Sequence, residues 1–63
     1  MTPPDVALLR LDEVAERLSV SPSTVRRLIR RGDLKAVRIG RLLRVRPADL
    51  TTYIQAHIEG EKP

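Results

Sequence analysis

Two short helical patterns with only three residues between them constrain the fold of this chain more than any other feature. In the first pattern, apolar residues recur at the spacing of one buried helical face, at Leu11, Val14, Ala15 and Leu18. In the second, the apolar residues are Val25, Leu28 and Ile29. The break at residues 19–21 allows only a tight turn, with Val20 available to pack between the helices. The spacing therefore predicts a helix-turn-helix.

The ends of these helices carry recognisable signals. Ser21 followed by Pro22 predicts the start of the second helix, because a hydroxyl can cap it and proline suits its first position. Gly32 predicts the end of that helix. The first helix is less regular, since Arg10 stands where a capping hydroxyl is usual and arginine accepts no hydrogen bond. We therefore expect Asp12 to cap it and the helix to begin a residue or two later.

The spacing of apolar residues changes after Gly32. Residues 34–39 and 42–46 alternate between aliphatic and basic side chains on either side of Gly40 and Arg41. This pattern predicts a β-hairpin with one aliphatic face and one arginine face. Leu42 is unexpected near the tip of such a hairpin, where a polar residue is usual. Residues 8–11 are predicted to form a short extended segment before the first helix.

A last helix is predicted to begin at Pro47 and end at Gly60. Its apolar stripe consists of Leu50, Tyr53, Ile54 and Ile58, with His57 alongside. The predicted fold class is mainly α with a small β-hairpin: a winged helix-turn-helix with the hairpin as wing and a C-terminal helix. The predicted organisation is a flexible arm at residues 1–7, one domain at residues 8–58 and a frayed tail at residues 59–63.

Composition excludes several classes of function. With 63 residues, no cysteine and one histidine, the chain offers no zinc finger, disulfide scaffold, multi-histidine metal site or catalytic triad. We expect a protein that is not an enzyme and needs no metal or cofactor. The longest apolar run, residues 6–9, is far shorter than the ~20 residues of a membrane span, so no membrane association is expected. A cytoplasmic, nucleoid-associated protein is the expected class.

Basic residues are concentrated in the middle of the chain. Ten of the twelve lysines and arginines lie between Arg17 and Arg46, where Asp33 is the only acidic residue. This distribution favours a polyanionic partner, and arginine suits bidentate contacts with phosphate or guanine. Tyr53 is the only aromatic residue, which argues against single-strand recognition by base stacking.

A helical wheel places the candidate binding residues on the second helix opposite its apolar stripe. They are Ser23, Thr24, Arg26, Arg27, Arg30 and Arg31. The wing adds Arg38, Arg41 and Arg44. Two other readings remain open: the helix arginines form a solvated surface, and the wing arginines protect an edge strand against aggregation. The absence of any acid between Ser21 and Gly32 favours nucleic acid.

The chain resembles the excisionase branch of the MerR-like winged helix-turn-helix domains. The residues that carry the resemblance are 9–18 and 19–32, followed by 34–41 and 47–50. The resemblance implies binding to double-stranded DNA, with the second helix in the major groove and the wing in the adjacent minor groove. It makes Ser23, Thr24, Arg26, Arg27 and Arg30 the candidates for base contact. The wing contacts would come from Arg38, Arg41 and Arg44.

Many small members of this family are excisionases, or recombination directionality factors, which bind repeated sites, bend DNA and promote integrase-mediated excision of a phage or integrative element. The resemblance therefore implies DNA, an integrase and further copies of the chain on DNA as partners. No small-molecule ligand is expected, because the effector domain of full MerR-type regulators is not seen. A small MerR-like transcriptional regulator is the alternative, and a protein-interaction adaptor is a third class.

Overall fold

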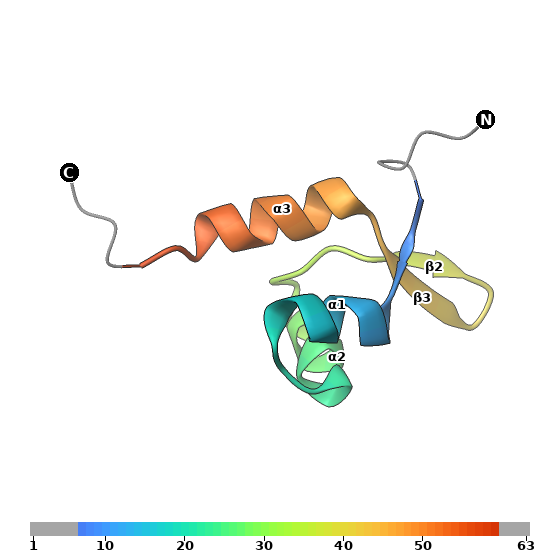
Figure 1. The fold of residues 1–63 in the computed structure, drawn as a ribbon. Coiled ribbons are helices and arrows are strands. Elements are labelled where there is room, and N and C mark those ends of the chain that lie inside the picture. The colour runs from blue at the N-terminus through green and yellow to red at the C-terminus, as the bar shows by residue number, and fades with distance from the viewer. Residues whose placement is uncertain (1–6, 60–63) are drawn as a thin grey trace.

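The computed structural model describes residues 7–59, so the predicted arm and tail lie outside it except for Ala7 and Glu59. The elements in chain order are β1 (Leu9–Arg10), α1 (Leu11–Leu18), α2 (Pro22–Arg31), β2 (Val37–Ile39), β3 (Leu42–Val45) and α3 (Pro47–Ala56). The strands form an antiparallel sheet in the order β1-β3-β2. Helices α1 and α2 lie on one side, β2 and β3 form the wing, and α3 reaches away from the rest (Figure 1). This is the predicted winged helix-turn-helix.

One small core holds these elements together. Its fully buried side chains are Val14, Val25, Leu34 and Val45, and Leu9, Ala15 and Leu50 are nearly as buried. Every helix contributes to this core, as do β1 and β3. In contrast, β2 has no buried residue, so the wing is held to the body mainly through β3.

The start of α1 differs from the prediction. Helix α1 begins at Leu11 with Arg10 as its N-cap, not a residue or two later with Asp12 as cap. The Arg10 backbone N–H donates to the Glu13 carboxylate at 2.8 Å. Arginine cannot return that bond, and the Glu13 N–H donates instead to the neighbouring Asp12 carboxylate at 3.0 Å. In a usual capping box, a hydroxyl side chain at the N-cap would accept from the Glu13 N–H. Here the Asp12 carboxylate accepts from that N–H, and the Glu13 carboxylate accepts from the Arg10 N–H as in the usual motif.

The turn between α1 and α2 is closed by its backbone. Ser19 adopts a left-handed conformation with φ of 59°, and its N–H donates to the Glu16 carbonyl. The Val20 N–H donates to the Ala15 carbonyl at 2.9 Å, which completes a Schellman motif. The Val20 side chain remains 40% exposed. The prediction that Val20 packs between the helices is therefore wrong.

The strands are shorter and more connected than the sequence pattern predicts. Residues 34–36 precede β2 rather than joining it, because the Leu34 side chain turns into the core. The predicted extended segment before α1 is confirmed as β1. It pairs with β3, with Leu9 opposite Val45 and Arg10 opposite Arg44. The sheet therefore has a third strand, which the hairpin prediction did not include.

Helix α3 begins at Pro47 as predicted but ends at Ala56, and Gly60 lies outside the described residues. His57 is the C-cap of α3, and its ring stacks on the ring of Tyr53 at 4.2 Å between centroids. Leu50 is buried and Tyr53 packs against the core. Ile54 is 41% exposed, because this part of α3 extends beyond the body (Figure 1). Only the first half of the predicted apolar stripe therefore packs.

Candidate nucleic-acid interface

A firm cap fixes the direction of α2. The Ser21 hydroxyl accepts the Thr24 N–H at 3.2 Å, and Pro22 occupies the first helical position. At the other end, Gly32 has φ of 84° and closes the helix, as predicted. The Thr24 hydroxyl lies 3.0 Å from the Ser21 hydroxyl and accepts from the Arg27 guanidinium at 3.3 Å. The Thr24 hydroxyl is therefore already hydrogen-bonded at the start of α2.

The core contact of α2 turns the predicted residues outward. Val25 is fully buried, and Leu28 and Ile29 pack beside it. The opposite side of the helix is exposed and carries Ser23, Arg26, Arg27, Arg30 and Arg31. Thr24 is half-buried. Because Ser23 is small and lies at the N-terminal end, this end of the helix can approach another surface closely.

The wing turns at Gly40, whose φ of 61° suits the first position of a two-residue type II′ hairpin loop. The register pairs Val37 with Arg44 and Arg38 with Leu43. Since residues opposite each other share a face of the sheet, each face carries both aliphatic and basic side chains. The prediction of one aliphatic and one arginine face is therefore wrong. The two-residue loop sets a register that the alternation alone did not reveal.

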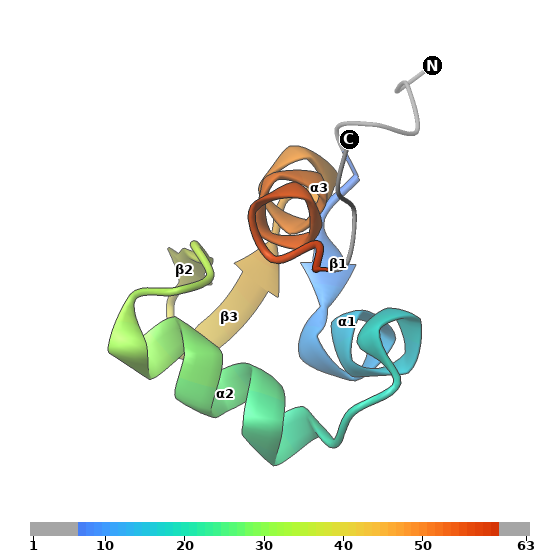
Figure 2. The same ribbon diagram turned by 90° about the vertical axis from the view of Figure 1, so that its left-hand side faces the viewer.

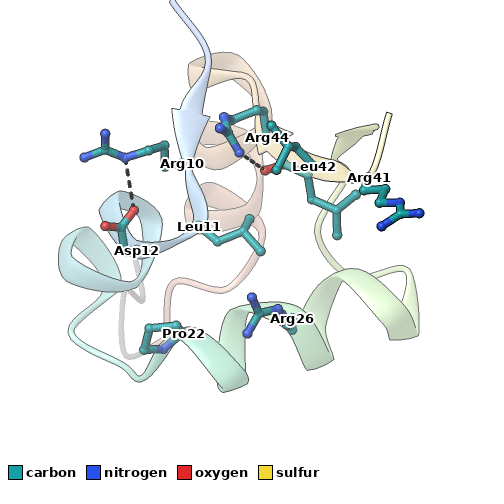
Figure 3. A pocket seen from close by; sticks show the side chains of 9 residues that line it. Arg10, Leu11, Asp12, Pro22, Arg26, Arg41, Leu42 and Arg44 are labelled. Carbon is teal, nitrogen blue, oxygen red and sulfur yellow. Dashed lines mark hydrogen bonds and ion pairs between the residues drawn. The ribbon is translucent and has the colours of Figure 1, made fainter. Parts of the chain in front are cut away.

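Residues of the wing and of α2 together line two surface hollows. The first, which we call the Arg38 hollow, is lined by Arg26, Ile29, Arg30, Arg38 and Leu43. The second, the Leu42 hollow, is lined by Arg10, Leu11, Asp12, Pro22, Arg26, Arg41, Leu42, Leu43 and Arg44 (Figure 3). Arg26 lines both hollows, so it lies where α2 meets the wing. Figure 2 shows α2 on the opposite side of the molecule from α3.

Not every predicted residue takes part in this junction. Ser23, Thr24, Arg27 and Arg31 line neither hollow and occupy the remaining outward surface of α2. Arg44 is half-buried, and its guanidinium donates to the Leu43 carbonyl at 2.9 Å. It therefore presents less of its charge than Arg41, which is exposed at the wing tip.

Ion pairs separate the arginines of this protein into two groups. Arg10 pairs with Asp12 at 3.3 Å, Arg31 with Asp33 at 3.3 Å, and Arg46 with Asp49 at 2.6 Å. Within residues 7–59, six arginines of α2 and the wing have no carboxylate partner: Arg26, Arg27, Arg30, Arg38, Arg41 and Arg44. Apart from Arg17 of α1, the arginines without a carboxylate partner in the described residues are therefore gathered on the surface that α2 shares with the wing.

The pair between Arg46 and Asp49 belongs to the scaffold rather than to this surface. Both carboxylate oxygens accept hydrogen bonds from the Arg46 guanidinium, at 2.6 and 3.0 Å. These bonds, together with the positive charge of Arg46, hold the pKa of Asp49 below its ordinary value. Asp49 lies in the first turn of α3, where a carboxylate is favoured by the helix dipole. The pair joins the end of β3 to α3.

Six lining residues of the Leu42 hollow were not among the predicted site residues: Arg10, Leu11, Asp12, Pro22, Leu42 and Leu43. The first four come from β1, α1 and the start of α2, and no local pattern shows that the wing folds over them. Leu42 was the one sequence signal of this hollow, because an aliphatic residue near the tip of an isolated hairpin would be exposed to water without a packing partner. It is 54% exposed.

Residues 7–59 contain no group of three His, Asp or Glu side chains placed to hold a metal ion. None of the helices described is long and apolar enough to cross a membrane.

Comparison with known proteins identifies the family. Residues 8–58, which are 51 of the 63, match the family described as the helix-turn-helix domain. Neither the curated proteins nor the solved structures gave a match to the chain. The match covers every helix and strand of the structure, including both hollows. The chain therefore belongs to the helix-turn-helix domain family, a DNA-binding family that includes excisionase-like proteins.

Proposed function

We propose that this chain is a sequence-specific double-stranded DNA-binding protein that acts as an excisionase, or recombination directionality factor. The observation that carries the DNA-binding part is the junction of α2 and the wing, where arginines from both elements line common hollows. A polyanion that touches one of these elements meets the other as well. The helix-turn-helix family supplies the class of polyanion, which is duplex DNA.

The two elements divide the recognition of DNA between them. The outward side of helix α2 has small residues at its start and arginines further along. This arrangement suits entry into the major groove. There Arg27 and Arg30 can reach guanine O6 and N7. The wing then meets the adjacent minor groove, whose strong negative potential favours Arg38 and Arg41. Binding, not catalysis, is the proposed role.

The role in recombination rests on the family and on the architecture. Excisionase-like proteins belong to the family, and a helix and wing that grip adjacent grooves can stabilise a bend between them. In this mechanism several copies bind adjacent direct repeats, bend the DNA and favour the excision complex of an integrase. No ligand-dependent switch is part of the proposal.

Mapping the protein on DNA in its own cells tests this proposal. Occupancy at direct repeats beside a recombination junction, together with protein-dependent excision by the neighbouring integrase, is the expected result. Occupancy at promoters distant from any integrase would replace the proposal with the MerR-like transcriptional regulator. No enriched site anywhere would favour a protein-interaction adaptor and would overturn DNA binding as the function.

A further inference from the structure

Leu42 is the most exposed of the large apolar side chains in the described chain. Its partner across the hairpin, Ile39, is 49% exposed. The two residues differ in their surroundings, because Leu42 lines the hollow between the wing and the helices while Ile39 lines none of the hollows described above. In Figure 3 the Leu42 side chain points into that hollow from the wing, and Leu11 points into it from α1. Apolar surface is therefore presented to an internal groove and not only to solvent.

The Leu42 hollow combines an apolar floor with positive charge. Leu11, Pro22 and Leu42 supply the apolar atoms. Arg26 points toward the hollow from α2, and Arg41 lies at its outer edge beyond the wing tip (Figure 3). Arg10 and Asp12 neutralise each other at the far side. A neutral apolar ligand would leave Arg26 and Arg41 unpaired, and a free anion would leave the leucines against water.

We propose that the Leu42 hollow binds the sugar-phosphate backbone of one DNA strand, with the deoxyribose against Leu42 and the flanking phosphates on Arg26 and Arg41. This inference rests on the proposed function. When α2 occupies a major groove and the wing occupies the next minor groove, the strand that separates the two grooves must cross the space between them. The Leu42 hollow lies in that space, because it is lined by Arg26 of α2 and by Arg41 and Leu42 of the wing. Its volume of about 320 Å³ is at the lower end of ligand pockets (roughly 300–1,000 Å³), which suits a short length of backbone.

The chemistry of the sugar gives the hollow a preference. Deoxyribose offers C–H groups to Leu42, whereas ribose would place its 2′-hydroxyl on the minor-groove side, toward the wing. A hydroxyl held against leucine loses its hydrogen bonds to water without a replacement. The hollow therefore selects deoxyribose over ribose at the nucleotides that cross it.

Two single substitutions at the wing tip test the proposal, measured on a duplex selected in vitro by the wild-type protein. Leu42→Ser should weaken binding about fivefold, because roughly half of a leucine side chain is no longer removed from water. The slope of affinity against salt should not change, since no charge is lost. Ile39→Ser is the comparison variant at the same wing tip, and its loss should be clearly smaller, because Ile39 lines neither hollow. Circular dichroism checks that both variants fold.

Equal losses in the two variants would overturn the proposal, because they would indicate an apolar wing tip inserted as a unit between bases. Unchanged binding by Leu42→Ser would also overturn it. If the wild-type protein itself binds no duplex, the proposed function fails as well. That outcome is distinct from a wild type that binds DNA without help from Leu42.

A ribonucleotide scan through the same duplex gives an independent test. For the wild type, one or two consecutive ribonucleotides per bound copy should weaken binding several-fold. With Leu42→Ser that loss should disappear, because the serine hydroxyl can bond to the 2′-hydroxyl. The same loss in both proteins at every position would overturn the placement of the sugar against Leu42.

Discussion

Arg26 occupies the point where α2 and the wing meet, so its replacement gives the sharpest prediction. It lines both hollows and has no carboxylate partner in residues 7–59. Each phosphate contact contributes about −0.9 to the log–log slope of affinity against salt. If all six unpaired arginines of α2 and the wing contact phosphate, the wild-type slope is about −5, and raising salt from about 50 to 200 mM weakens binding by about 10³-fold.

Arg26→Ala should make this slope less steep by about 0.9. The penalty of the substitution should therefore shrink by about 3.5-fold between roughly 50 and 200 mM salt. Fluorescence anisotropy of a labelled duplex at four or five salt concentrations measures both quantities. Arg26→Lys is the matched control, because it keeps the charge and should keep the wild-type slope.

A penalty for Arg26→Ala that is the same at every salt concentration would refute the reasoning. It would mean that Arg26 acts through an uncharged contact or through the fold. A slope near zero for the wild type itself would refute the larger claim that the unpaired arginines bind phosphates.

Four further predictions follow from the same structure. Arg27→Ala should lower affinity for a selected duplex by about 1–3 kcal/mol more than for a random duplex, if Arg27 reads a base; equal losses would make it a phosphate contact. Val45→Ala should destabilise the domain by about 2 kcal/mol in urea unfolding, because Val45 is fully buried in a small core; a loss below about 0.5 kcal/mol would contradict that burial. Ser19→Gly should raise the free energy of unfolding by about 0.5 kcal/mol, because glycine adopts φ of 59° without strain; a decrease would contradict the left-handed turn. Hydrogen bonds with Arg46 lower the pKa of Asp49 in the folded state, so ionised Asp49 stabilises the fold above its ordinary pKa and this stabilisation is lost as pH falls through the lowered value. The Tm of the wild type should therefore exceed that of Asp49→Asn at neutral pH but not at low pH. A difference in Tm that is independent of pH would contradict the pairing.

The order of elements was predictable because each carries a local signal. The stripe of Val25, the cap at Ser21 and the stop at Gly32 all lie within α2 and act on its own backbone. Pro47 likewise marks the start of α3. These signals depend on neighbours in the sequence, so no tertiary information was needed to read them.

Two of the errors depend on contacts that are distant in sequence. Leu34 is buried because the whole core surrounds it, and the alternation of residues 34–39 contains no sign of this. The third strand exists because β1 meets β3, some 35 residues further along the chain. Neither feature is encoded in a window of ten residues. The faces of the wing are a local error instead, because they depend on a register that the loop at Gly40 sets between Val37 and Arg44.

The candidate site shows the same division. The wheel placed the arginines of α2 outward because Val25 fixes which side is buried. It did not show that Arg31 is paired with Asp33, or that Arg44 is half-buried beside Leu43. The Leu42 hollow is lined by residues of β1, α1, α2 and β3, so its lining residues from β1 and α1 could not be found by any local motif.

The central claim is that α2 and the wing form one surface for duplex DNA. Backbone amide and arginine side-chain NMR shifts, recorded as a selected duplex is added, test it most directly. The account predicts that the largest changes fall in α2 and in residues 38–44, with little change in α3. Changes confined to α2 would contradict the joint surface, and changes centred on α3 would place the DNA on the opposite side of the molecule.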